Sequence, residues 1–127
     1  MKKLFNISDL RTEDIIEILS FDKVDHLKKY ENILYNKSIG LIFEKYSTRT
    51  RVSFKVAINQ MGGNPLDINF NELNFQRSES FEDTFKTLSL YLDAIIYRTN
   101  DHKKIELAYK YFNKPIINAL SDISHPC

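Results

Sequence analysis

SIGLIFEKYSTRTRVSF, residues 38–54, joins a short apolar run to a polar junction and the start of a helical pattern. Residues 38–43 are almost continuously apolar, which is typical of a β-strand buried on both faces. After the junction, apolar residues recur at the i, i+3, i+4, i+7 spacing of an amphipathic helix as far as Met61. The pair Gly62-Gly63 then ends the pattern, as glycine often ends a helix. The stretch predicts a buried strand followed at once by a helix.

The same alternation continues on both sides of this stretch. Three more strands are predicted, over residues 65–70, 94–97 and 115–120. Further helical patterns cover residues 12–20, about 24–34, the segment behind Ser80, and 105–112. Thr12 is expected to be the N-cap of the first helix, and Ser80 with Asp83 has the spacing of a capping box. We therefore predict a single α/β domain over residues 1–127, a three-layer α/β/α fold with a four-stranded parallel sheet.

Composition excludes several classes of protein. The 127 residues allow one ordinary domain, 43% of them are hydrophobic, and the net charge is only +1. The charge gives no reason to expect nucleic acid or a membrane as a partner, and no apolar run is long enough to cross a bilayer. The single cysteine, Cys127, excludes an internal disulfide or a cluster of CxxC type. With no signal-peptide pattern at the start, we expect a cytoplasmic protein without a metal or other cofactor.

The arginines are concentrated where strands end. Only five of the 18 basic residues are arginines, at positions 11, 49, 51, 77 and 98. Four of these follow a predicted strand, and His125 follows the last one. The carboxyl ends of parallel strands share one edge of a sheet, which is where open α/β sheets bind ligands. Scattering by chance is therefore the weaker interpretation, and a ligand site at this edge is predicted.

The junction after the first strand has the chemistry of an anion site. A helix begins there with unpaired N–H groups and the positive end of its dipole. Ser47, Thr48 and Thr50 add hydroxyl groups, and Arg49 adds a guanidinium that matches phosphate oxygens. The alternative is that the hydroxyls cap the helix while the arginines pair with nearby acids, an interpretation that suits Arg51 better than Arg49. Neither a Walker loop nor a GxGxxG fingerprint is present, so a small phosphorylated molecule is favoured over a nucleotide.

Four motifs together resemble the aspartate/ornithine carbamoyltransferase family. They are FEKYSTRTRVSF, ESFEDT, IIYR and the terminal HPC. The resemblance covers the whole chain and implies the amino-terminal, carbamoyl-phosphate-binding half of a larger enzyme. The order F-E-K-x-S-T-R-T-R and then H-P-C is more typical of the ornithine enzymes. Aspartate enzymes, the second choice, usually have proline where this chain has Tyr46.

The resemblance assigns roles residue by residue. It implies a phosphate cradle made of Ser47, Thr48, Arg49 and Thr50. It also implies three catalytic residues that donate hydrogen bonds to the carbonyl oxygen of the ligand: Arg98, His125 and Thr50. The remaining substrate-binding residues are Asn74, Pro126 and Cys127. Asn74 stands where the family usually has glutamine, and Gln76 and Ser78 stand at usual glycines, while Arg77 is retained.

The implied reaction is the transfer of a carbamoyl group to the side-chain amine of L-ornithine, giving L-citrulline and phosphate, in arginine metabolism. The half that would bind ornithine has no counterpart in this sequence, so the chain alone is expected to be inactive. The resemblance also implies a homotrimer with shared sites, reached by a long loop at residues 70–78. A module that binds phosphate or assists assembly without chemistry is the alternative from another class. His26 and His102 are expected to be surface residues.

Overall fold

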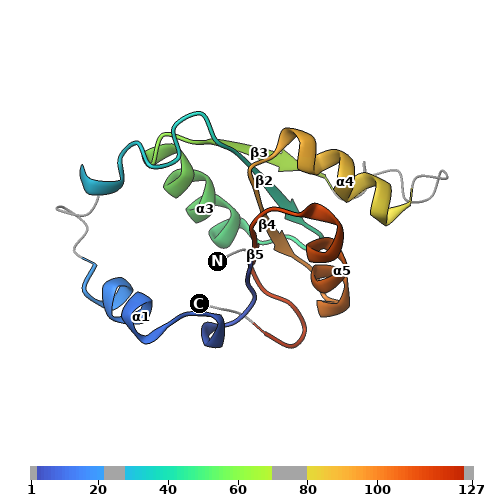
Figure 1. Ribbon diagram of the computed structural model, residues 1–127, viewed down its shortest axis with the longest axis horizontal. Helices are drawn as coiled ribbons and strands as arrows, with labels where there is room; N and C mark the ends of the chain where they lie inside the picture. Colours follow the sequence, from blue (N-terminus) through green and yellow to red (C-terminus); the bar gives the residue numbers. More distant parts are fainter. Residues whose placement is uncertain (1–2, 22–27, 70–79, 125–127) are drawn as a thin grey trace.

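The computed structural model describes residues 3–21, 28–69 and 80–124. Its centre is a five-stranded parallel sheet in the order β1-β5-β4-β2-β3 (Figure 1). The strands are β1 Lys3–Leu4, β2 Ser38–Phe43, β3 Asn64–Ile68, β4 Ala94–Arg98 and β5 Ile116–Asn118. The helices are the 3-10 helix η1 Ile7–Asp9, then α1 Thr12–Leu19, α3 Thr48–Gln60, α4 Phe81–Tyr91 and α5 His102–Phe112.

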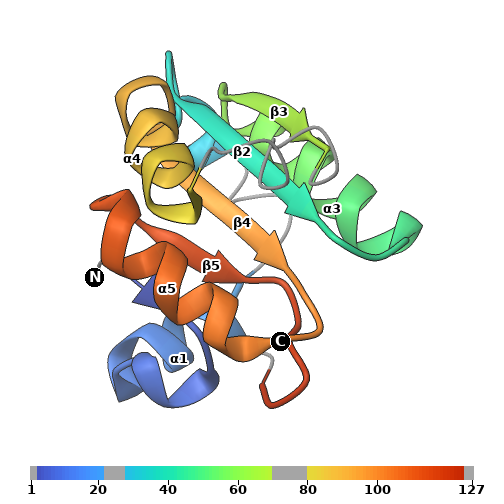
Figure 2. The ribbon, with the colours of Figure 1, turned by 90° about the vertical axis from the view of Figure 1, so that its right-hand side faces the viewer.

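Helices cover both faces of the sheet, so the three-layer prediction is confirmed (Figure 2). On one face, Phe85 of α4 and Phe112 of α5 pack with Ile42, Ile95 and other strand residues. On the opposite face, α3 contributes Ile58, which packs against the odd-numbered residues of β2 and the even-numbered Ile96 of β4. Strand β2 lies inside the sheet, between β4 and β3, and is buried on both faces, which explains why residues 38–43 are apolar without alternation.

The sheet has one strand more than predicted. Strand β1 is two residues long and pairs with β5 at the edge of the sheet, with Lys3 opposite Ile116. So short a strand carries no measurable periodicity, which is why the sequence did not reveal it. The four predicted strands are confirmed, although β3 ends at Ile68 rather than at residue 70 and β5 ends at Asn118 rather than at residue 120. The chain turns there because Leu120 adopts a positive φ of 123°.

The predicted helices are largely confirmed, with two corrections. The N-cap of α1 is Arg11 rather than Thr12, because the carboxylate of Asp14 accepts a hydrogen bond from the Arg11 N–H at 3.0 Å. Within the helix expected over 24–34, the described part is a single helical turn at residues 28–30 followed by turns. Gly62, at the end of α3, has a φ of 81°, as its predicted role requires. No helix in the described part of the chain is long and apolar enough to cross a membrane.

Candidate anion site at the carboxyl edge of the sheet

Two neighbouring strands bring the central residues of the site together. Strands β2 and β4 pair in parallel, with Phe43 opposite Arg98. Just beyond the last pair, the N–H of Glu44 donates to the carbonyl oxygen of Arg98 at 3.0 Å. This bond holds the start of the loop that leads into α3 beside the end of β4. Arg98 and the loop therefore meet at the carboxyl edge, as the sequence predicted.

The first turn of α3 is open. Ser47 occupies the N-cap position, but its hydroxyl does not cap the helix. Instead, Nη1 of Arg98 donates to Oγ of Ser47 at 2.8 Å. The first helical hydrogen bond runs from the N–H of Arg51 to the carbonyl oxygen of Ser47. Among the described residues, nothing accepts from the N–H groups of Thr48, Arg49 or Thr50. Three backbone donors and a guanidinium are thus available to an anion.

The charged residues of the turn itself, Arg49 and Arg51, are basic. No acidic residue lies in the first turn of α3. Arg49 is exposed and forms no ion pair within the described part of the chain. Arg51, in contrast, approaches Asp67 of β3, with 3.9 Å between Nη1 and Oδ1. The alternative in which an arginine pairs with a nearby acid is therefore confirmed for Arg51 and wrong for Arg49. The alternative in which Ser47 caps the helix is also wrong.

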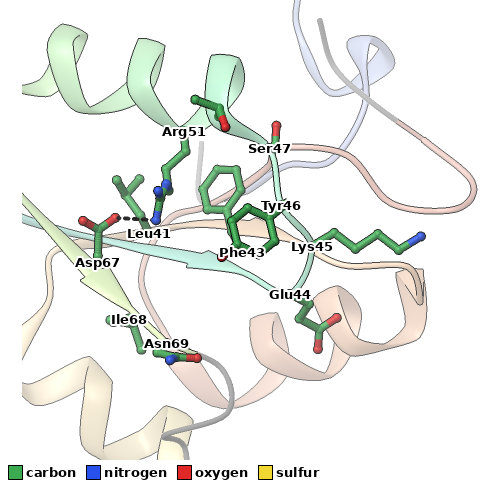
Figure 3. Close-up of a pocket in the computed structure, with 11 residues that line it drawn as sticks. Leu41, Phe43, Glu44, Lys45, Tyr46, Ser47, Arg51, Asp67, Ile68 and Asn69 are labelled. Atoms are coloured by element: carbon green, nitrogen blue, oxygen red, sulfur yellow. Dashed lines mark ion pairs between the residues drawn. The ribbon is translucent and has the colours of Figure 1, made fainter.

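A cavity of about 480 Å³ opens next to the cradle (Figure 3). It lies between the end of β2 and the end of β3 and is bordered by Ser47 and Thr48. Figure 3 shows the Arg51–Asp67 pair on one side of this cavity, while Lys45 extends away from it. Arg49 and Arg98 do not line it. The open N-terminus of α3 is the candidate anion site, because hydrogen-bond donors, not volume, select an anion.

Glu44 is the acid closest to the cradle in sequence, and it is well partnered. Lys104 of α5 donates to Oε1 of Glu44 at 2.9 Å, and the hydroxyl of Tyr97 donates to the same oxygen at 3.3 Å. Burial, with the Glu44 carboxylate nearby, raises the pKa of Tyr97 well above its usual value. The phenol therefore remains a neutral donor. The sequence alone placed Glu44 no further than among the acids near the arginines, and it gave no sign of the contact with Lys104.

The turn after β5 is held by buried Asn118. Its side-chain nitrogen donates to the carbonyl oxygens of Phe5 and Ser124, and its oxygen accepts from the N–H of Leu120 at 2.9 Å. The carbonyl oxygen of Leu120 in turn accepts from the N–H of Thr99, next to Arg98. The end of β5 is thereby fixed to the end of β4.

Several predicted site residues lie outside the described residues. They are Asn74, Gln76, Arg77, Ser78, His125, Pro126 and Cys127, together with His26. His102 is described, and it is not a free surface residue. It is half-buried, its Nδ1 lies 2.8 Å from Oγ of Ser121, and its ring meets Phe5 edge-on. Within the described chain, no group of three His, Cys, Asp or Glu side chains could hold a metal ion.

These features are typical of α/β domains that bind a small anion: the N-terminus of α3 is open, and Arg98 holds Ser47 at the carboxyl edge of the sheet. The family model described as aspartate/ornithine carbamoyltransferase, carbamoyl-P binding domain, matches residues 2–127. The chain belongs to this family, as its amino-terminal, carbamoyl-phosphate-binding half.

Three similar proteins illustrate the match. The ornithine carbamoyltransferase of Methanococcus aeolicus is 46% identical over 98% of this chain and 41% of its own length. The solved ornithine carbamoyltransferase from Pyrococcus furiosus is 42% identical with a TM-score of 0.86, covering 99% of this chain and 42% of that one. The catalytic subunit of M. jannaschii aspartate transcarbamoylase is 32% identical with a TM-score of 0.79, covering 99% and 43%. The chain thus spans about two fifths of the length of the relatives it matches.

Proposed function

We propose that the full-length protein is an ornithine carbamoyltransferase in which this chain binds carbamoyl phosphate. The observation that carries the proposal is the open first turn of α3, with Ser47 held by Arg98 instead of capping the helix. A phosphate placed there accepts from three backbone N–H groups and gains from the helix dipole. Arg49 adds a charge that no described acid neutralises.

The reaction needs stabilisation of a developing negative charge. The amine nitrogen of ornithine attacks the carbonyl carbon of carbamoyl phosphate, and electrons shift onto the carbonyl oxygen. The bond from carbon to the phosphate oxygen then breaks, phosphate leaves, and the amine loses its proton. Among the described residues, Arg98 is suited to bind both the carbonyl oxygen and the phosphate oxygen that leaves, because its guanidinium lies beside Ser47. Thr50 and His125 complete the set of donors to the carbonyl oxygen.

We favour ornithine over aspartate as the second substrate of the proposed reaction. The support is the F-E-K-x-S-T-R-T-R and H-P-C pattern, the tyrosine at position 46, and the ornithine enzymes among the relatives with above 40% identity. Similarity to an aspartate transcarbamoylase of 32% identity keeps aspartate as the second candidate. By the family resemblance, the half that would bind the amine is the part of the relatives that this chain does not cover.

The direct test is an assay of the full-length protein with carbamoyl phosphate and either amine. Citrulline formed from ornithine is the expected product. Carbamoyl-aspartate formed from aspartate would replace the proposal with the second candidate. Binding of carbamoyl phosphate without transfer to either amine would favour a non-enzymatic binding module.

We also propose that the full-length protein works as a homotrimer with shared sites. The support is the family resemblance together with exposed apolar side chains of α3, Val52 and Val56, next to edge strand β3. Mixing inactive Arg49→Ala subunits with inactive subunits that carry Asn74→Ala and Arg77→Ala tests it. Recovered activity after subunit exchange is expected. No recovery, or an active monomer, would rule out shared sites.

A further inference from the structure

The carboxylate of Glu44 is in an unusual position for an acid. It lies at the end of β2, three residues before Ser47, and it borders the cavity beside the anion site. Only 10% of its side chain is exposed. A buried carboxylate is costly unless it is paired, and an unpaired one here would repel a phosphate.

Lys104 supplies the missing positive charge from another element. Its Nζ lies 2.9 Å from Oε1 of Glu44, across 60 positions of sequence. Every other acid in an ion pair of the described residues keeps a quarter or more of its side chain exposed. Exposed ion pairs contribute little to stability, but the Lys104–Glu44 pair differs from them because its carboxylate is largely buried.

The place of Lys104 on its helix supports the same conclusion. It is the third residue of α5, and the first turn of a helix disfavours positive charge because of the helix dipole. The acids at this helix start bind backbone groups: Asp101, the N-cap, accepts from the N–H of Lys103, and Asp122 accepts from the N–H of His102. The side chain of Lys104 pairs with Glu44, in another element.

The contacts form a closed ring beside the anion site, and Lys104 is attached to this ring at Glu44. Glu44 accepts from Tyr97, which is completely buried. Tyr97 adjoins Arg98 in β4, and Arg98 donates to Ser47. The chain from Ser47 back to Glu44 closes the ring. Fixing Glu44 thus fixes the loop that presents Ser47 and the strand that presents Arg98.

We propose that Lys104 is a positioning residue for the anion site: it neutralises Glu44 and so keeps this carboxylate from repelling the phosphate or capturing Arg98. The inference rests on the proposed function, because it concerns the same site. Without the Lys104 charge, Glu44 still adjoins Arg98, whose carbonyl oxygen accepts from the Glu44 N–H at 3.0 Å. A guanidinium drawn to Glu44 leaves Ser47 and the ligand.

The test uses the full-length protein with carbamoyl phosphate and, as a second probe, inorganic phosphate. Lys104→Met removes the charge and keeps the length of the side chain, and Lys103→Met is the matched control on an exposed neighbour. We expect Lys104→Met to weaken binding of both probes roughly tenfold, the scale of one uncompensated charge near a dianion. Lys103→Met should bind as the unchanged protein does, and Lys104→Arg should retain most of the affinity.

A second substitution separates positioning from simple packing. In the double variant Lys104→Met with Glu44→Gln, the uncompensated charge is gone, so affinity should recover to within about threefold of the unchanged protein. Thermal melting of each variant confirms that it is folded. The inference is overturned if Lys104→Met binds like Lys103→Met, or if Glu44→Gln fails to restore affinity in a folded double variant.

The outcomes also separate this inference from the proposed function. If the unchanged protein binds phosphate but not carbamoyl phosphate, the proposed function is wrong, and the Lys104 comparison is still made with phosphate. If the unchanged protein binds carbamoyl phosphate and Lys104→Met is without effect, only the inference fails. If it binds neither probe, both are wrong.

Discussion

The first turns of α3 and α4 share a serine at the N-cap, but they differ in whether that serine caps the helix. Each helix follows a strand of the sheet and has serine at its N-cap, Ser47 in α3 and Ser80 in α4. Oγ of Ser80 accepts from the N–H of Asp83 at 3.0 Å, and two acids lie in that first turn. Ser47 caps nothing, and its helix begins with arginines instead of acids. One helix satisfies its own N-terminus, and the other leaves it open for a ligand.

The difference comes from what lies beside each serine. Arg98, at the end of β4, donates a hydrogen bond to the hydroxyl of Ser47. This contact spans 51 positions of sequence and stands in place of a local cap. An unsatisfied N-cap typically costs about 1 kcal/mol of stability. Because α4 is capped and α3 is not, we expect the uncapped N-terminus of α3 to have a function in ligand binding. The predictions below test that contrast.

The largest expected effect follows from Arg98→Met. It removes the donor to the developing negative charge, so kcat of the full-length enzyme should fall by about 100- to 1,000-fold. Stability should change little, because the released hydroxyl of Ser47 becomes able to cap α3 as Ser80 caps α4. Steady-state kinetics and thermal melting measure the two effects. Arg11→Met, a change of an exposed arginine on α1, is the control, and equal losses in both variants would contradict the assignment.

The second effect compares the residues two positions after each N-cap, Arg49 in α3 and Glu82 in α4. Arg49→Ala should weaken binding of carbamoyl phosphate roughly 10- to 100-fold, since it removes a charge-assisted contact to phosphate. Glu82→Ala loses the pair with Lys86 on the same helix, worth only about 0.5 kcal/mol of stability. Its affinity for the ligand should be unchanged. Calorimetric titration measures both, and an unaltered affinity in Arg49→Ala would be incompatible with the site.

The smallest effect concerns the serines themselves. Ser80→Ala removes a working cap and should lower the free energy of unfolding by about 1 kcal/mol. Ser47→Ala removes a hydroxyl that caps nothing, so its effect on unfolding should be only about a few tenths of a kcal/mol. Denaturant unfolding of the two variants gives the comparison. A larger loss in Ser47→Ala than in Ser80→Ala would show that the open turn is not open in solution.

Much of this architecture could be predicted because buried parallel strands are short apolar runs between helical patterns. Strand β2 was expected over 38–43 and begins and ends there. Strand β1 could not be predicted, because two residues show no pattern. The end of β5 was placed too late, because apolar Ala119 and Leu120 follow the strand while Asn118 already turns the chain.

The site was predictable to the extent that it depends on strand order. Residues that follow parallel strands share an edge, so Ser47 and Arg98 could be expected to meet. The contact of Lys104 with Glu44 could not, since it depends on how the first turn of α5 packs against the end of β2. His102 was misjudged for a related reason. Its partners Ser121 and Phe5 are distant in sequence, and a polar helix start resembles a surface.

The central claim, that the first turn of α3 is kept open for the phosphate of a ligand, is tested most directly by closing it. Ser47→Asp places a carboxylate among the open N–H groups and next to Arg98, and Ser80→Asp makes the same change on α4, where a cap already exists. The measurement is the affinity of each full-length variant for carbamoyl phosphate, together with its melting temperature. We expect Ser47→Asp to melt higher than the unchanged protein and to bind at least about 100-fold more weakly, because the carboxylate stabilises the helix and occupies the anion site. Ser80→Asp should change neither quantity appreciably. Undiminished binding by a folded Ser47→Asp protein would contradict the claim.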